Sequence, residues 1–330
     1  MSTHVILRVL ATLAGCIAVV GLSAAAQTGG TASGFPSRPA RIVVPFPPGG
    51  QPDIFTRLIV PRMVASLKQQ IIVDNRPGAG SMVGSRIVAD ATPDGYTLLA
   101  ISGAHTTAPF VRKLPYNTQK DFAGVTRAYN AAYLLVTPTS FSAKSVKELI
   151  DLAKSRPGAL NFASAGAGSG THFAGEMFKY RARIDVVHVP YRGIAAALND
   201  IIAGRVQFFM APLGSSANLV RDGRIRALGV SSAKRIPVIS DIPTIAESGL
   251  PGFAWDSWGA IFAPSKTPRA VVSLWNREMH RAMAAPEVQE RLRAIGMEVA
   301  PSTPAELDAM VKEEMAVVAT LAKAAGIKPQ

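Results

Sequence analysis

Two glycine-rich segments carry the residue types best suited to hold a small anion. Residues 45–53 (PFPPGGQPD) and residues 161–172 (NFASAGAGSGTH) each follow a β-branched or apolar run and precede a helical pattern. Glycine lets backbone N–H groups approach a ligand, and a helix N-terminus adds partial positive charge. Each segment could therefore bind an anion without a cationic side chain, and two such segments could face each other across a cleft. A plain strand-to-helix turn is the alternative for a lone Gly49-Gly50 pair.

Neither segment matches a nucleotide-binding motif. The first lacks the Lys-Ser/Thr pair of a phosphate-binding P-loop. The second has Thr171 where a dinucleotide fingerprint requires glycine, and Asp185 precedes the next predicted strand instead of ending it. The sequence therefore disfavours a nucleotide cofactor.

Residues for catalysis or metal binding are not grouped in the sequence. The chain contains no G-x-S-x-G and no H-E-x-x-H motif, and its histidines at 105, 172, 188 and 280 lack metal-ligand spacing. Asp53 occupies the position expected of a helix N-cap, and no nucleophile or second acid stands beside it. We expect no catalytic residue, no metal and no cofactor.

The elements that would position the two segments alternate between strands and helices, which is typical of a parallel α/β sheet. The pattern forms two blocks, 36–135 and 136–252, and a helical tail that should pack back on one of them. If the tail returns to the first block, the chain crosses between domains twice, near 135 and 255, which is a hinge arrangement. The predicted strands are 41–46, 71–74, 97–101, 133–137, 160–163, 186–189, 206–210 and 225–230, and residues 253–262 are read as extended. The predicted helices are 54–67 (kinked at Pro61), 81–91, 145–155, 172–182, 195–203, 215–222, 268–284, 287–295 and 304–324.

Composition limits the class of protein. The chain has 330 residues, enough for two domains, and 48% hydrophobic against 17% charged residues, which excludes a disordered chain. The net charge of +13 comes from scattered Lys and Arg without a basic run, so the pattern disfavours nucleic-acid binding while it could steer small anions. The single cysteine, Cys16, can form no internal disulfide.

Residues 1–26 are predicted to be an export signal. A short basic start with Arg8 precedes an apolar run over 9–22, and Ala24–Ala26 supply the small residues that a signal peptidase requires. We expect cleavage near Ala26 and a soluble periplasmic protein that begins near Gln27. A lipobox at residues 13–16, which would lipidate Cys16, is the alternative.

A series of ordered motifs resembles the solute-binding receptors of tripartite tricarboxylate transporters, the Bug-type periplasmic proteins. The motifs span the mature chain and lie at residues 36–53, 75–80 (NRPGAG), 93–99 (PDGYTLL), 114–122, 144–149 (KSVKEL), 187–193 (VHVPYRG), 232–235 and 241–252. The resemblance implies an α/β, two-lobed type-2 periplasmic-binding-protein fold, with two βαβ domains joined by a double-crossing hinge. The implied lobes are 27–135 plus 253–330, and 136–252.

The resemblance also implies that a ligand carboxylate is clasped between the two glycine segments. Carried over, this points to Phe46, Gly49, Gly50, Gln51 and Asp53 in the first lobe and to Ser164, Ser169, Gly170, Thr171 and His172 in the second. Further pocket candidates are Ser102, His105, Tyr191 and Met210. Gln51, followed by Pro52, replaces the family's usual small polar residue, which could alter ligand choice, and Met210-Ala211 suggests a less polar pocket floor.

The implied function is a monomeric, non-catalytic receptor that delivers a small carboxylate to a membrane permease or reports it to a sensor kinase. A periplasmic enzyme acting on a small anion is the alternative. Within the receptor hypothesis, Arg192 offers a rival to backbone binding, because a side-chain cation could be the main anchor.

Overall fold

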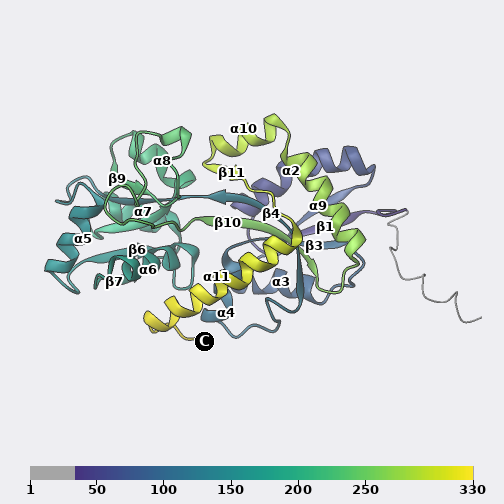
Figure 1. Ribbon diagram of the computed structural model, residues 1–330, viewed down its shortest axis with the longest axis horizontal. Coiled ribbons are helices and arrows are strands. Elements are labelled where there is room, and N and C mark those ends of the chain that lie inside the picture. Colours follow the sequence, from purple (N-terminus) through teal and green to yellow (C-terminus); the bar gives the residue numbers. More distant parts are fainter. Residues whose placement is uncertain (1–33, 330) are drawn as a thin grey trace, which may run out of the picture. The chain divides into compact units, whose positions relative to one another are not determined.

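Two β-sheets organise the part of the chain that the computed structural model describes, residues 34–329 (Figure 1). The predicted signal segment, with Ala24–Ala26, Gln27 and the alternative lipidation site Cys16, lies outside these residues. No helix within 34–329 combines the length and apolar character needed to cross a membrane.

The first sheet has six strands in the order β11-β4-β10-β3-β1-β2. β1 is parallel to β2 and β3, whereas β10 runs antiparallel between β3 and β4. The strands are β1 (Ala40–Val44), β2 (Ile71–Asn75), β3 (Thr97–Ser102), β4 (Phe122–Ala131), β10 (Ser257–Pro264) and β11 (Met297–Val299). The helices associated in sequence with this sheet are α2 (Gln51–Leu67), α3 (Met82–Ala89), α4 (Ala104–Val111), α9 (Arg269–Met283) and α10 (Pro286–Ala294).

The second sheet has five strands in the order β7-β6-β8-β5-β9. β6 is parallel to β7 and β8, and β5 is antiparallel to β8 and β9. The strands are β5 (Tyr133–Pro138), β6 (Asn161–Ser164), β7 (Val187–Pro190), β8 (Phe208–Pro212) and β9 (Ile225–Val230). The helices between them are α5 (Val146–Ser155), α6 (Gly170–Ala182), α7 (Ile194–Ile202) and α8 (Leu213–Arg221).

The expectation of parallel sheets needs correction, because both sheets are mixed. β5 and β10, the strands by which the chain enters the second sheet and returns to the first, are antiparallel to both neighbours. Parallel neighbours require a crossover connection that carries the chain back to the same end of the sheet. β5 enters directly from β4 of the other sheet and β10 returns directly from the second sheet, so no β-α-β crossover links either strand to its own sheet neighbours.

Ser231 ties together the two segments that pass between the sheets. Its N–H donates to Tyr133 O at 2.9 Å, and its Oγ accepts from Tyr133 N at 2.9 Å. The same hydroxyl donates to Asp256 Oδ1 at 2.6 Å, and Trp255 N donates to Ser231 O at 3.1 Å. The start of β5 and the segment before β10 are therefore held side by side through one residue.

The C-terminal helix α11 (Pro304–Ala324) packs with the apolar cores of both sheets, which corrects the expectation that the tail packs on one block. Leu307 and Val311 lie in the first core with residues of β3 and β10, whereas Val318 and Leu321 lie in the second core with residues of β6 and α6. Figure 1 shows this helix, in yellow, running from the first sheet's helices toward α6. Thr303 and Glu306 form a reciprocal capping box that fixes where α11 begins.

Local sequence signals placed most elements close to their observed bounds. β9 and α11 begin and end at the predicted residues, and Ser145 caps α5 by accepting from Glu148 N, as predicted. No element was predicted for residues 102–132, where the structure has α4 and β4, and the short β11 was not predicted either. α2 continues through Pro61 and begins three residues earlier than expected.

Candidate functional site

A cavity of about 300 Å³ lies where segments of both sheets converge. Its wall includes the start of α4 (Ser102, Gly103, Ala104), the loop before α6 (residues 165–170) and the segment that leads into β10 (residues 255–258). Tyr133 and Phe173 add aromatic surface, and Phe46, Gly80, Thr107, Ala108, Val111, Arg112 and Glu314 complete the lining. The cavity therefore combines two helix N-termini with aromatic side chains.

The start of α6 presents unused backbone donors at this cavity. Ser169 is the N-cap, and its Oγ accepts from His172 N at 3.2 Å. Among residues 34–329, no acceptor satisfies the N–H groups of Gly170 and Thr171, the first two positions of the helix. Gly170 itself lines the cavity, and a Cβ at this position would lie 2.8 Å from Tyr133 Oη. An anion at this point would meet two N–H donors and the positive end of the helix dipole.

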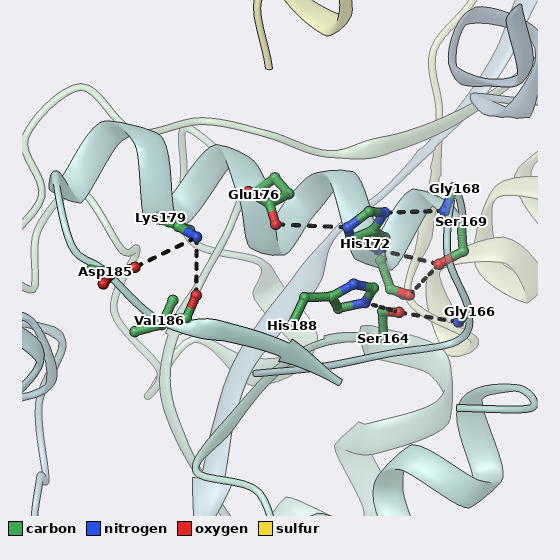
Figure 2. A network of polar contacts seen from close by, with 11 residues as sticks. Ser164, Gly166, Gly168, Ser169, His172, Glu176, Lys179, Asp185, Val186 and His188 are labelled. Atoms are coloured by element: carbon green, nitrogen blue, oxygen red, sulfur yellow. Dashed lines mark hydrogen bonds and ion pairs between the residues drawn. The ribbon is translucent and has the colours of Figure 1, made fainter. Parts of the chain in front are cut away.

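Hydroxyl groups behind the loop set its shape (Figure 2). Thr171 Oγ1 accepts from Ala165 N at 2.9 Å and lies 2.9 Å from Ser169 Oγ. Ser164 Oγ accepts from Gly166 N at 3.1 Å. Gly166 and Gly168 have φ of +128° and +79°, a backbone region that favours glycine. The sequence folds into this loop because its glycines permit the path and its hydroxyls satisfy the N–H groups.

Two stacked histidines, the buried His172 of α6 and the half-buried His188 of β7, support the same loop. The rings of His172 and His188 lie 3.8 Å apart between centroids, and His172 Nδ1 accepts from Gly168 N at 3.0 Å (Figure 2). His172 Nε2 lies 3.7 Å from Glu176 Oε1, and His188 Nε2 lies 2.7 Å from Ser164 Oγ. Burial, followed by the nearby His172, lowers the pKa of His188 to about 4. His188 is therefore neutral at physiological pH and can accept from the Ser164 hydroxyl.

In the first glycine segment, the N-cap residue and the partner of the Gly49 N–H differ from those expected. Asp53 is in the first turn of α2, and Gly50 takes the N-cap position that was predicted for Asp53. The buried Asp53 carboxylate accepts from Gly49 N at 2.9 Å, from Asn75 Nδ2 at 2.9 Å and from Arg57 Nε at 3.0 Å. Its pKa is lowered: burial opposes this shift, and these hydrogen bonds together with Arg57 outweigh it. In this structure the Gly49 N–H and the Asp53 carboxylate satisfy each other.

The predicted binding residues fall into three groups. Phe46, Ser102, Ser169 and Gly170 line the cavity. Ser164, Thr171 and His172 are buried behind the α6 loop and hold it. The third group neither lines the cavity nor holds the α6 loop, and it consists of Gly49, Gly50, Gln51, Asp53, His105, Tyr191 and Met210.

Three of these outlying residues have other contacts. His105 stacks on Phe262 at 4.2 Å in the first sheet's core. Tyr191 donates from its hydroxyl to Asp200 Oδ2 at 2.9 Å. Met210 is fully buried in β8, so neither it nor Ala211 forms the floor of the cavity.

Several lining residues were not predicted from the sequence, among them Tyr133, Trp255, Asp256, Trp258 and Glu314. They come from the segments that pass between the sheets and from the middle of α11, so no local motif marks them. The predicted crossings near residues 135 and 255 could have indicated these residues, because segments that join two sheets pass beside a site between them. Arg192 is exposed and does not line the cavity, whereas the exposed Arg112 does.

Comparison with known proteins defines the class. The model of the tripartite tricarboxylate transporter family receptor matches residues 55–327, and the chain belongs to this family. It is 42% identical over 282 residues to the UPF0065 protein in the tcbD-tcbE intergenic region of Pseudomonas sp. strain P51, covering 85% of this chain and 84% of that protein. It is 31% identical over 324 residues to protein BugT of Bordetella pertussis, with 97% and 98% covered. The resemblance to Bug-type receptors is thereby confirmed.

The solved structures confirm the two-lobed α/β fold. The structure of R. palustris Rpa4515 with adipate superposes with a TM-score of 0.77 at 34% identity, covering 90% of this chain and all of that chain. Members of the family are periplasmic solute-binding receptors, so the chain is a receptor and the alternative of a periplasmic enzyme is set aside.

Proposed function

We propose that this receptor captures a small carboxylate in the cavity beside Gly170 and presents it to the permease of a tripartite transporter or to a sensor kinase. One observation carries the proposal: the N–H groups of Gly170 and Thr171 have no acceptor among the described residues, and Gly170 lines the cavity. A carboxylate there would gain charge-assisted hydrogen bonds and the α6 dipole. The adipate in the R. palustris relative supports this ligand class.

The same proposal assigns roles to the rest of the predicted site. The lobes are 27–135 plus 253–330 and 136–252, and they close on the ligand by bending where the chain passes between the sheets. Closure would bring the first glycine segment, with Gly49 and Gly50, toward the bound carboxylate. Ligand-induced closure is the expected behaviour of a two-lobed receptor.

Export completes the proposal. The signal at residues 1–26 is removed near Ala26, so that the mature receptor begins near Gln27 as a soluble monomer without Cys16. Mass spectrometry of the periplasmic protein measures this directly, and a diacylated Cys16 at the N-terminus would contradict it.

The variant Gly170→Asp tests the anion site. Its carboxylate and Cβ would enter the position of the ligand, beside Tyr133 Oη. We expect carboxylate binding to weaken at least about 100-fold in titration calorimetry, which corresponds to roughly 2.7 kcal/mol. Gly223→Asp is the matched control, because Gly223 has open space around it and lies outside the cavity.

Arg192→Gln examines the rival mechanism. If backbone donors hold the carboxylate, this variant binds as the unmodified protein does, since Arg192 does not line the cavity. Near-normal affinity in Gly170→Asp together with lost binding in Arg192→Gln would overturn the backbone mechanism.

A further inference from the structure

The charges on the cavity wall do not suit a ligand that is purely anionic. Among the described lining residues, Arg112, Asp256 and Glu314 carry a formal charge, and Arg112 is exposed. The wall thus has an excess of carboxylates in a chain whose net charge is +13. A receptor that captured simple dicarboxylates would place two like charges next to part of its ligand.

One carboxylate oxygen of Asp256 is free to accept a further hydrogen bond. Its Oδ1 accepts from Ser231 Oγ at 2.6 Å, and no donor among residues 34–329 reaches its Oδ2. The guanidinium of Arg127 acts electrostatically on both Asp256 and Glu314, and among the described residues no ion pair joins it to either acid. Burial, the largest influence, raises the pKa of Asp256. One guanidinium thus stands near two carboxylates, and Asp256 Oδ2 lies in a partly desolvated position without a donor from the described part of the chain.

Glu314 is the second acid, and it comes from the middle of α11, between the parts of that helix that pack in the two cores. Its Oε2 accepts from Trp258 Nε1 at 2.5 Å. Burial raises the pKa of Glu314 to about 7, against the opposing influence of Trp258, Arg127 and Thr106. Both acids would keep their charge more easily beside a bound cation.

The two helix N-termini of the cavity are not equivalent. α6 has no acidic residue in its first turn, and the N–H groups of Gly170 and Thr171 remain for a ligand carboxylate. At α4, Glu314 lines the cavity together with Gly103 and Ala104 at the start of that helix, so an acid of the protein already belongs to this part of the wall. The cavity therefore has one place that attracts an anion and another that attracts a cation.

We infer that the ligand is an amino-carboxylate whose carboxylate binds at the start of α6 and whose ammonium group is bound by Asp256 and Glu314. This inference rests on the proposed function and names the substrate class of the same site. An ammonium group can donate to the second oxygen of Asp256 and to Glu314, which a second ligand carboxylate cannot do. Trp255, Trp258 and Phe173 enclose the apolar part of the ligand between the two charged ends.

Two matched ligand sets test the inference by titration calorimetry at pH 7.5. The aliphatic set is hexanoate, 6-aminohexanoate and adipate, and the aromatic set is benzoate, 4-(aminomethyl)benzoate and terephthalate. In at least one set, the amino acid should bind at least about 10-fold more tightly than both the plain acid and the diacid, a difference of about 1.4 kcal/mol. Equal affinities within the sets that bind, or preference for the diacid, would overturn the inference and leave the carboxylate receptor intact. Failure of all six compounds would overturn the proposed carboxylate function itself.

The variants Asp256→Asn and Glu314→Gln assign the preference to these residues. Each keeps the size of the side chain and removes its charge, so each should reduce the advantage of the amino acid at least about 5-fold while the plain acid binds at least as tightly as before. Glu313→Gln, on the exposed side of the same helix, is the matched control and should change neither affinity. Thermal unfolding without ligand verifies that each variant is folded. An amino-acid preference that persists in both variants would contradict the assignment.

Discussion

At the scale of single residues, the protonation of His188 couples the shape of the anion loop to pH. His188 accepts from Ser164, which in turn accepts from Gly166 N, so the chain of hydrogen bonds requires a neutral ring. The charged and titratable groups around it are His172, Glu176 and Lys179, and burial is the largest influence on its pKa. The neutral histidine is therefore part of the structure that holds the loop.

The free energy of unfolding should fall as pH decreases from about 6.5 to about 4. Because the folded-state pKa of His188 is lowered to about 4 from 6.5, the unfolded chain binds a proton in this window and the folded chain does not. The contribution is fully present above pH 6.5 and is lost toward pH 4. His188→Gln, whose amide oxygen can still accept from Ser164, should make the dependence shallower in chemical denaturation at several pH values. Identical slopes for both proteins would contradict the prediction.

At the scale of elements, Gly168 connects the α6 loop to α4. A Cβ at this position would lie 2.8 Å from both γ-methyl carbons of Val111, and φ is +79°. The loop can therefore approach α4 only where the side chain is absent. This contact links segments associated with different sheets at the edge of the cavity.

Gly168→Ala should destabilise the protein by about 1–3 kcal/mol, because it adds backbone strain and overlap with Val111. Adding Val111→Ala should recover the part due to overlap, and Val111→Ala alone completes the double-mutant cycle. Gly223→Ala is the matched control, since Gly223 has φ of +67° and open space, and it reports the cost of backbone strain alone. Equal destabilisation in Gly168→Ala and Gly223→Ala would show that the contact with Val111 contributes nothing.

At the scale of the whole molecule, three connections within residues 34–329 join the two sheets. Two are the segments that Ser231 holds together, and the third is α11, which packs in both cores. In the proposed closure the first two connections would bend, while α11 would keep its packing in both cores. This arrangement favours a limited closing rotation over free movement.

Saturating ligand should reduce the radius of gyration in small-angle X-ray scattering, because contacts formed only in the closed state shift the population toward it. The matched control is Gly170→Asp with the same concentration of ligand, where weakened binding should leave the profile unchanged. Scattering profiles of the unmodified receptor that coincide with and without ligand would contradict closure.

The sequence by itself determined most elements, the family and the glycine loop before α6. Local signals carried this information: Ser145 and Thr303 mark helix starts, and β-branched runs mark buried strands such as Ile225–Val230. Gly166 and Gly168 reveal the loop because few other residues tolerate its backbone conformation. Each of these features depends on residues close together in the chain.

The tertiary structure alone decided which side chains form the cavity wall. Tyr133, Asp256 and Glu314 are distant in sequence and meet because the chain passes twice between the sheets and α11 spans both. It also decided that Asp53 satisfies Gly49, and that His172 supports the loop from behind. Burial and electrostatic environment arise from packing across the whole fold, so no local pattern could predict an acidic wall in a basic protein.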